Sequence, residues 1–300
     1  MKYYRLISAE DGTRLAVETQ EGVLTDLTSL DEDLTDLEDL ASAASISGST
    51  IDEITEKLMQ SGQPDIIYLE DVLDTSSESG YQLDRPFDPP EVWAAGVTYK
   101  TSEMERRRES ETPDVYSKVY AADRPEFFFK ATPARCVGPF EFVGIREDSA
   151  WDVPEPELAF VLYKGEIIGY TIGNDMSSRT IEGENPLYLP QAKVFDRCCA
   201  IGPCFVTAES IGNPHDLSVS CVIVRNGEDV FSGETSTSEM ARTCDELADW
   251  IQRHNYMPNM TTVLTGTAIV PPPEFTLQEG DQVVITIEGI GVLENEVMVV

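Results

Sequence analysis

Two glutamates separated by one residue, Glu155 and Glu157, stand directly before a wholly apolar stretch, 158–163. On an extended chain, side chains two residues apart point to the same face of a sheet. Two carboxylates at the start of a buried strand repel each other unless a cation neutralises them, and hard divalent cations prefer oxygen ligands. The pair therefore predicts a metal site, although a solvated strand edge would give the same spacing.

Further polar residues follow other predicted strands. Asp175 comes after the apolar stretch 167–172, and Lys193, one of only seven lysines, lies among apolar residues. Thr267 ends a Thr-Gly-Thr triplet, whose glycine allows the backbone to approach a ligand closely. If these strand ends meet in one pocket, they combine three carboxylates, an ammonium group and hydroxyls, a set that is typical of a metal-dependent active site.

The elements that must position these groups fall into two regions. The first region, 1–85, is predicted to be a small α/β domain, which ends in the polar stretch 75–80 and the prolines that follow it. Its predicted elements are strands over 3–7 and 14–17 around an Asp11-Gly12 turn, a leucine-spaced helix within 30–40, and a helix over 51–60 with Thr50 and Glu53 as a capping box.

The second region, 86–300, is rich in strands, and Asn226-Gly227 is a strong hairpin signal. Its predicted strands are 158–163, 167–172, 219–224, 230–231, 282–287 and 292–300, and an amphipathic helix is marked by apolar residues from Met240 to Ile251. We therefore predict an α+β fold that is mainly β, with 86–300 as the catalytic domain.

The charge of the chain excludes some partners. Its 300 residues include 55 acidic and 21 basic side chains, a formal net charge of -34 that is spread along the sequence. Such a charge repels nucleic acids and anionic membranes, and no apolar run is long enough to span a bilayer. At molar salt the Debye length is only about 3 Å, so the self-repulsion vanishes. We expect a halophilic enzyme, with an acidic mesophilic protein as the alternative.

The amino terminus and the cysteines bear on the compartment. The first residues lack the apolar stretch of a secretory signal, which favours a cytoplasmic protein. None of the six cysteines forms a CxxC pair, which indicates a reducing compartment. Cys198, Cys199 and Cys204 suggest a soft-metal site, but adjacent cysteines rarely face one ion, so buried thiols are expected.

Five motifs together resemble the fumarylacetoacetate hydrolase superfamily over roughly residues 92–300. They are ExELAFV (155–161), GYTIGNDMSSR (169–179), AKxFD (192–196), LTGT (264–267) and GDxVxIxIEGIGxLEN (280–295). The resemblance implies a distorted β-roll catalytic domain, a smaller N-terminal domain, and a homodimer or homotetramer. It also implies Mg²⁺, or another divalent cation such as Mn²⁺ or Ca²⁺, bound by Glu155, Glu157 and Asp175.

Further residues match the family's motifs. The resemblance maps its active-site lysine onto Lys193, a substrate-contacting threonine onto Thr267, and a Phe-Phe-x-Lys segment onto 128–130, which makes Lys130 a candidate for substrate binding. One departure concerns the histidine with which hydrolytic members activate water, because Ser102 stands where we would place it. The two histidines, His215 and His254, are expected to be structural or solvated. This departure disfavours hydrolysis of a C–C bond.

Residues 174–193 are similar to one branch of that superfamily, the 2-dehydro-3-deoxy-D-arabinonate (2-keto-3-deoxy-D-xylonate) dehydratases of archaeal pentose oxidation. The branch resemblance implies a 2-oxo acid substrate that loses water to give 2,5-dioxopentanoate. A divalent cation on the substrate's carboxylate and ketone would acidify the C3 protons. An archaeal source would suit the halophilic charge pattern.

The remaining roles are hypotheses with open alternatives. Lys193 is expected to stabilise the enolate or act as the base, with a structural ion pair as the alternative. Glu126, beside three phenylalanines, is a candidate acid or base, although an exposed glutamate fits equally well. Arg179 and Glu182 are candidates for binding the substrate's carboxylate or hydroxyls; Glu182 replaces a glutamine familiar at this place in the family. Of the arginines at 106–108, on a candidate lid, at most one is expected in the pocket.

Two classes of rival function remain at this stage. An acylpyruvate hydrolase or oxaloacetate decarboxylase on the same scaffold would cleave a C–C bond, whereas a dehydratase leaves the carbon chain intact. A non-catalytic metal-binding protein is the more remote rival, because the motifs with Glu155, Asp175, Lys193 and Thr267 are all intact.

Overall fold

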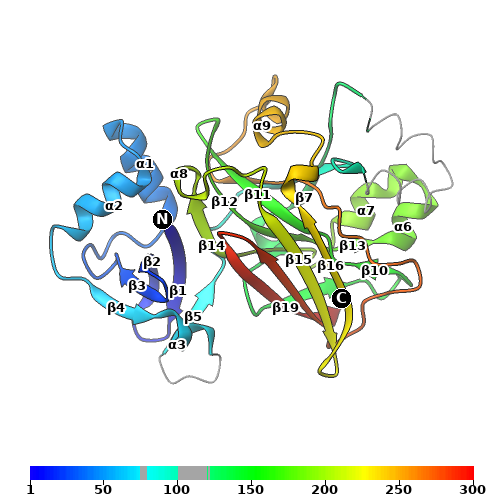
Figure 1. The fold of residues 1–300 in the computed structure, drawn as a ribbon, viewed down its shortest axis with the longest axis horizontal. Coiled ribbons are helices and arrows are strands. Elements are labelled where there is room, and N and C mark those ends of the chain that lie inside the picture. Colours follow the sequence, from blue (N-terminus) through cyan, green and yellow to red (C-terminus); the bar gives the residue numbers. More distant parts are fainter. Residues whose placement is uncertain (75–79, 101–119, 121) are drawn as a thin grey trace.

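A computed structural model describes residues 1–74, 80–100, 120 and 122–300 (Figure 1). The N-terminal region contains β1 (Lys2–Ser8), β2 (Gly12–Gln20), β3 (Val23–Asp26), α1 (Leu37–Ser47), α2 (Ile51–Met59), β4 (Asp65–Tyr68), α3 (Leu69–Leu73) and β5 (Tyr81–Asp84). The rest contains β6 (Val92–Gly96), β7 (Glu126–Ala131), β8 (Cys136–Val137), β9 (Phe142–Ile145), β10 (Asp152–Val153), β11 (Pro156–Tyr163), β12 (Glu166–Asp175), β13 (Ser177–Ser178), α6 (Arg179–Glu184), α7 (Leu189–Lys193), β14 (Cys199–Thr207), α8 (Ala208–Ile211), β15 (Ser218–Arg225), β16 (Glu228–Ser236), α9 (Cys244–Gln252), β17 (Thr261–Leu264), β18 (Gln282–Ile287) and β19 (Gly291–Val299).

Two sheets dominate the described structure, which confirms the prediction of a mainly β fold with α elements. The larger sheet has the order β4-β3-β2-β1-β14-β12-β11-β17-β6-β7, with β5 beside β1 and β8 beside β14. The second sheet, β16-β15-β18-β19-β9, packs on the first through contacts of β19 with β14 and of β18 with β12 (Figure 1). The short pair β10-β13 lies at the side of α6 and α7.

The N-terminal elements follow local signals in the sequence. The predicted strands on either side of Asp11-Gly12 are confirmed as β1 and β2. The capping box of α2 is confirmed: the Glu53 amide donates to Thr50 Oγ1 (3.1 Å), and the Thr50 amide donates to Glu53 Oε2 (3.0 Å). The helix predicted within 30–40 starts only at Leu37, because the extended residue Asp36 caps it by accepting from the Glu38 amide at 2.9 Å.

The strands that carry the predicted metal ligands form an antiparallel hairpin. All eight residues of β11 are buried, because β11 lies between β12 and β17 and is covered on both faces. The tight turn at Lys164-Gly165 joins β11 to β12, so that the start of β11 lies beside the end of β12. Glu157 pairs with Gly173, and the Asp175 amide donates to the Glu155 carbonyl at 2.9 Å. This register brings the three predicted ligands together.

The other predicted elements of the second region are also present. Asn226 and Gly227 both have positive φ (55° and 82°) and join β15 to β16, as an Asn-Gly hairpin turn requires. Helix α9 starts at Cys244 rather than at Met240, because Thr243 Oγ1 caps it by accepting from the Glu246 amide. All six cysteines lie in described stretches and are buried free thiols, as expected. No helix among the described residues is long and apolar enough to cross a membrane.

The main sheet is continuous across the predicted boundary near residue 85. Strand β1 pairs with β14 through Lys2 with Val206 and Tyr3 with Phe205. Strand β14 in turn pairs with β12, which ends at Asp175. The division into 1–85 and 86–300 therefore remains a prediction, and the N-terminal strands extend the same sheet that carries the candidate site.

Candidate active site

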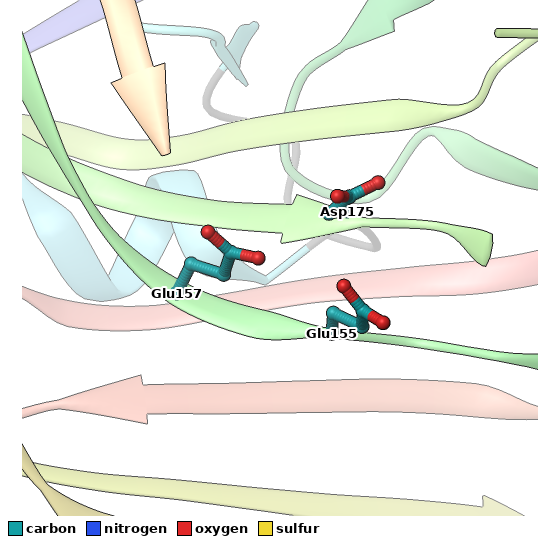
Figure 2. A group of neighbouring side chains, drawn as sticks. All are labelled: Glu155, Glu157 and Asp175. Carbon is teal, nitrogen blue, oxygen red and sulfur yellow. The ribbon is translucent and has the colours of Figure 1, made fainter. Parts of the chain in front are cut away.

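Three carboxylates converge where β11 starts and β12 ends (Figure 2). Each of Glu155, Glu157 and Asp175 offers an oxygen that lies within 4.8 Å of the oxygens offered by the other two, and all three residues are buried. Glu155 and Glu157 project from one stretch of chain toward Asp175 on the neighbouring strand. The i, i+2 spacing therefore places both glutamates on one face, as the sequence predicts.

The negative charges of this triad favour the binding of a cation. Burial, and next the neighbouring charges of Asp175 and Glu155, raise the pKa of Glu157 well above its ordinary value, although Lys193 and the Gly266 amide oppose this shift. Such a buried set of carboxylates holds a shared negative charge only if a positive group compensates it. An all-oxygen donor set fits a hard divalent cation such as Mg²⁺, Mn²⁺ or Ca²⁺.

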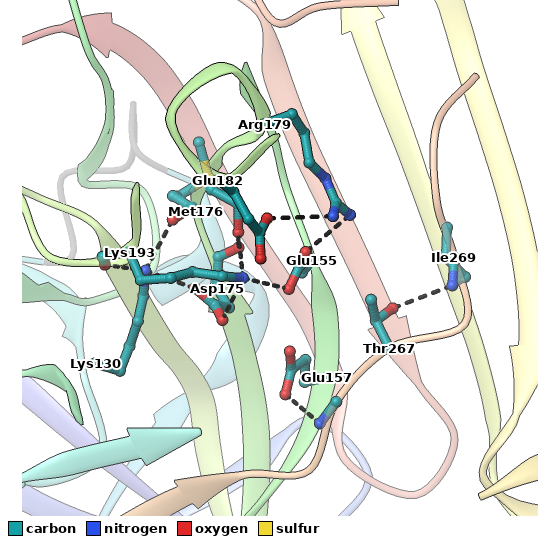
Figure 3. Close-up of polar contacts among 12 residues, drawn as sticks. Lys130, Glu155, Glu157, Asp175, Met176, Arg179, Glu182, Lys193, Thr267 and Ile269 are labelled. Atoms are coloured by element: carbon teal, nitrogen blue, oxygen red, sulfur yellow. Dashed lines mark hydrogen bonds and ion pairs between the residues drawn. The ribbon is translucent and has the colours of Figure 1, made fainter. Parts of the chain in front are cut away.

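Lys193, at the end of α7, lies against the triad (Figure 3). Its ammonium lies 2.7 Å from Glu155 Oε2 and 3.0 Å from Asp175 Oδ2, and it donates to Ser177 Oγ at 2.6 Å. Only 1% of this side chain is exposed. Lys193 is therefore held by two carboxylates and one hydroxyl, which account for the three hydrogens of its ammonium group.

Arg179 and Glu182 approach the triad from α6. Ser178 caps this short helix by accepting from the Ile181 amide at 3.2 Å, which orients its first residue. Arg179 Nη2 lies 2.9 Å from Glu155 Oε1, and its Nη1 lies 3.4 Å from Glu182 Oε2. Both side chains are buried, so the structure brings these two predicted substrate-binding residues to the triad (Figure 3).

Lys130, on β7, lies on the other side of Asp175. Its ammonium lies 2.5 Å from Asp175 Oδ1, and it also donates to the carbonyl oxygens of Met176 and Lys193. Burial lowers the pKa of Lys130, but the Asp175 carboxylate beside it, together with Cys198 and Cys199, outweighs burial and raises that pKa. The side chain is 0% exposed. The substrate contact predicted for Lys130 from the sequence remains a prediction.

The Thr-Gly-Thr loop after β17 orients Glu157 and places Thr267 nearby. The Gly266 amide donates to Glu157 Oε2 in a short hydrogen bond. Gly266 has φ +92°, and a Cβ here would lie 2.0 Å from Thr98 Oγ1, so only glycine fits this close approach. Thr267 is 5% exposed, and its hydroxyl accepts from the Ile269 amide at 3.1 Å.

Glu126 lies farther along the sheet, at the start of β7. Two strands, β17 and β6, separate β7 from β11, and Glu126 is half-buried with its carboxylate over Gly96. A Cβ at Gly96 would lie 2.2 Å from Glu126 Oε2. Its role as acid or base remains a prediction. Ser102 and the arginines at 106–108 lie outside the described residues.

The two histidines lie at the two ends of α9, which carries none of the triad. His215 Nε2 accepts from the Cys244 amide at 3.3 Å, at the start of α9, which is a structural contact as expected. His254 follows the end of α9 and is exposed.

Sequence reasoning missed one residue of the site, Ser177. Its hydroxyl accepts from Lys193 and donates to the Asp175 carbonyl at 3.0 Å. The available signal was its position two residues after Asp175, which predicts a common direction for the two side chains on an extended chain.

Comparison with known proteins places this site within a family. A family model described as fumarylacetoacetate (FAA) hydrolase C-terminal matches residues 91–298. A probable 2-keto-3-deoxyxylonate dehydratase of Haloferax volcanii is 52% identical over 300 residues, which are 100% of both chains. A 2-dehydro-3-deoxy-D-arabinonate dehydratase of Saccharolobus solfataricus is 48% identical over 220 residues, which cover 71% of this chain and 73% of the relative.

A solved structure extends this likeness to the fold. The structure of 2-keto-3-deoxy-D-arabinonate dehydratase complexed with magnesium and 2,5-dioxopentanoate has a TM-score of 0.81 and 35% identity, and the match covers 100% of this chain and 99% of that one. The matched family region contains the triad, Arg179, Glu182, Lys193 and Thr267. The chain belongs to the fumarylacetoacetate hydrolase family.

Proposed function

We propose that this protein is a metal-dependent hydro-lyase that converts 2-dehydro-3-deoxy-D-pentonate, derived from arabinonate or xylonate, to 2,5-dioxopentanoate in oxidative pentose degradation. The observation that carries the proposal is the buried triad with Lys193 and Arg179 against it. Two dehydratases of 2-keto-3-deoxy sugar acids are about half identical to this chain. A third was solved with magnesium and the proposed product.

The charges of the site support a divalent cation and an anionic substrate. Four carboxylates and three cationic side chains meet here, which leaves one net negative charge if all are ionised: Glu155, Glu157, Asp175 and Glu182 against Lys130, Arg179 and Lys193. A divalent cation would change this to one net positive charge, and a substrate with a single carboxylate would neutralise it. We propose Glu155, Glu157 and Asp175 as the residues that hold Mg²⁺.

The reaction removes a proton from C3 and the hydroxyl group from C4 of the 2-oxo acid, so that one water leaves and a C3–C4 double bond forms. Proton shifts from C5 and its hydroxyl to C3 and C4 then give the C5 aldehyde. When bound, a divalent cation would draw electron density from the ketone and acidify the C3 protons.

The residues around the triad would have separate roles in charge stabilisation, substrate binding and proton transfer. Lys193 supplies a fixed positive charge that stabilises the negative charge developing on the ketone oxygen, because three acceptors hold its ammonium group. Arg179, Glu182 and Thr267 would bind the substrate's carboxylate and hydroxyls. Glu126, half-buried at the start of β7 beside three phenylalanines, is the candidate acid or base.

We further propose that the protein forms a homodimer or homotetramer and that it is located in the cytoplasm. We also propose that a small N-terminal domain over 1–85 precedes a catalytic domain over 86–300. Exposed apolar side chains at Phe140, Phe142 and Val292 support an interface between subunits. Six buried free thiols fit a reducing compartment. The start of the family match at residue 91 supports the domain boundary. Light scattering of the purified protein tests the oligomer, and a monomer would contradict it.

An assay of the purified protein tests the activity. The protein is incubated with 2-dehydro-3-deoxy-D-pentonate and Mg²⁺ at high KCl, and the formation of 2,5-dioxopentanoate is followed. We expect product only when the metal is present. If the protein instead releases pyruvate from an acylpyruvate or from oxaloacetate, the dehydratase proposal is wrong and the protein cleaves C–C bonds.

A further inference from the structure

Lys130 connects three parts of the chain that are far apart in sequence. Its ammonium lies between the Asp175 carboxylate at the end of β12, the Met176 carbonyl that follows, and the Lys193 carbonyl at the end of α7 (Figure 3). The Met176 and Lys193 carbonyls belong to residues that follow Lys130 by 46 and 63 positions in the sequence. The ammonium donates hydrogen bonds to the two carbonyl oxygens and forms an ion pair with the Asp175 carboxylate.

The two oxygens of Asp175 are divided between two lysines. Oδ1 lies 2.5 Å from Lys130 Nζ, and Oδ2 lies 3.0 Å from Lys193 Nζ. A carboxylate that is fixed at one oxygen has a defined plane, and the direction of its other oxygen is then set. Lys130 therefore determines how Asp175 presents Oδ2 to the centre of the triad.

The same side chain fixes the backbone of a second functional residue. By donating to the carbonyl oxygen of Lys193, Lys130 anchors the end of α7, from which the Lys193 side chain reaches Glu155 and Asp175. The ring of Phe195 lies against the Lys130 ammonium at 5.5 Å from the ring centroid. Lys130 is 0% exposed, and both of its hydrogen-bond acceptors are main-chain carbonyls of the protein.

We propose that Lys130 is a positioning residue, which sets the geometry of the metal ligand Asp175 and of Lys193 without touching the substrate. This inference rests on the proposed function for its kinetic part only, since its effect on metal binding is independent of the substrate. Residues that orient metal ligands change metal affinity or activity by about 10- to 100-fold when they are removed.

The test compares Lys130→Met with Lys164→Met. Methionine is an unbranched side chain one atom shorter than lysine, and it removes the charge and the donors. Lys164 is an exposed lysine in the turn at the opposite end of β11, where its ammonium donates to Ser45 Oγ at 2.8 Å, so it is a matched control. Mg²⁺ affinity is measured by calorimetry, and kcat and KM are measured at saturating Mg²⁺. Circular dichroism checks that each variant is folded.

For Lys130→Met we expect Mg²⁺ affinity or kcat to fall by about 10- to 100-fold, with KM for the sugar acid within about twofold of the wild type. Lys164→Met should match the wild type in every measurement. A large rise in KM with unchanged kcat and Mg²⁺ affinity would assign Lys130 to substrate binding and overturn the proposal. Unchanged values throughout would also overturn it.

A second variant covers the case in which Lys130→Met does not fold. Lys130→Arg keeps the positive charge beside Asp175, but its planar guanidinium cannot reproduce the three tetrahedral donors. We expect a folded protein with weaker Mg²⁺ binding or lower kcat and an unchanged KM, and full activity with unchanged Mg²⁺ affinity would contradict this. If the wild type binds Mg²⁺ but does not dehydrate the sugar acid, the proposed function fails, while calorimetry still tests Lys130.

Discussion

Asp152→Asn should stabilise this protein at neutral and alkaline pH. Asp152 begins the short strand β10, is 4% exposed, and has no hydrogen-bond partner for Oδ1 among the described residues. Burial raises its pKa from the ordinary 3.8 to about 6, although contacts with Ser149 and Arg146 partly oppose this effect. The main-chain contacts of Asp152, in which its amide donates to Thr276 Oγ1 and its carbonyl accepts from the Leu277 amide, do not depend on the carboxylate.

The sign and size of the effect follow from this shift. The pKa is higher in the folded state than in the unfolded state, so the folded protein binds more protons between pH 3.8 and about 6 and loses stability as the pH rises through this window. Above this window, the ionised Asp152 carboxylate lowers the free energy of unfolding by a constant amount of about 3 kcal/mol, since one pKa unit corresponds to about 1.4 kcal/mol. At pH 5 the cost is only about half as large by the same relation. Asparagine, which carries no charge, avoids this cost.

Thermal unfolding at pH 5 and pH 8, at constant high KCl, measures the difference. We expect Asp152→Asn to raise the Tm by about 5 °C at pH 8 and by about half as much at pH 5, from the unfolding entropy of a chain of this size. Asp148→Asn is the control: Asp148 is exposed and its pKa is lowered by Arg146, so its replacement should give no gain. An equal gain at both pH values, or no gain at pH 8, would refute the reasoning.

Four further outcomes are expected. Glu155→Gln should abolish turnover, and calorimetry should detect no Mg²⁺ binding, while the far-ultraviolet circular dichroism stays the same. Full activity of this variant would contradict the assignment of Glu155 as a metal ligand. Lys193→Met should lower kcat by about 100-fold or more and leave the protein able to bind Mg²⁺, so wild-type kcat would exclude it from catalysis. Gly266→Ala should lower both stability and Mg²⁺ affinity, because its methyl group would displace Thr98 and the amide that holds Glu157, and unchanged values would contradict that contact. Transfer from molar KCl to about 0.1 M should lower the Tm, because screening of the net charge of -34 weakens, and an unchanged Tm would count against adaptation to salt.

The sequence predicted those parts of the site that depend on local periodicity. Strands β11 and β12 are apolar runs joined by a tight turn, so the prediction that Glu155 and Glu157 meet Asp175 needed only the alternation of a strand and one antiparallel register. The start of α1 was not predicted, because the leucine spacing continues through Leu34, whereas the cap at Asp36 determines where the helix begins.

The place of Lys130 could not be predicted for a different reason. Its partners are the Asp175 carboxylate and backbone carbonyls, and carbonyl groups leave no trace in the amino-acid sequence. A motif match assigned Lys130 to the site but could not show that its ammonium contacts Asp175 and two backbone carbonyls. The division of the Asp175 oxygens between two lysines appears only when β7, β12 and α7 are placed in space.

The pairing of β1 with β14 has a consequence for any attempt to shorten this enzyme. Met1 to Tyr3 cover the backbone of β14 at Phe205, Val206 and Thr207, next to the strand that ends in Asp175. A fragment without the N-terminal strands would expose the N–H and C=O groups of an apolar strand edge, which invites the addition of strands from other molecules. The N-terminal strand β1 thus protects the edge of β14 from pairing with other molecules. A shortened enzyme would need another element to cover that edge.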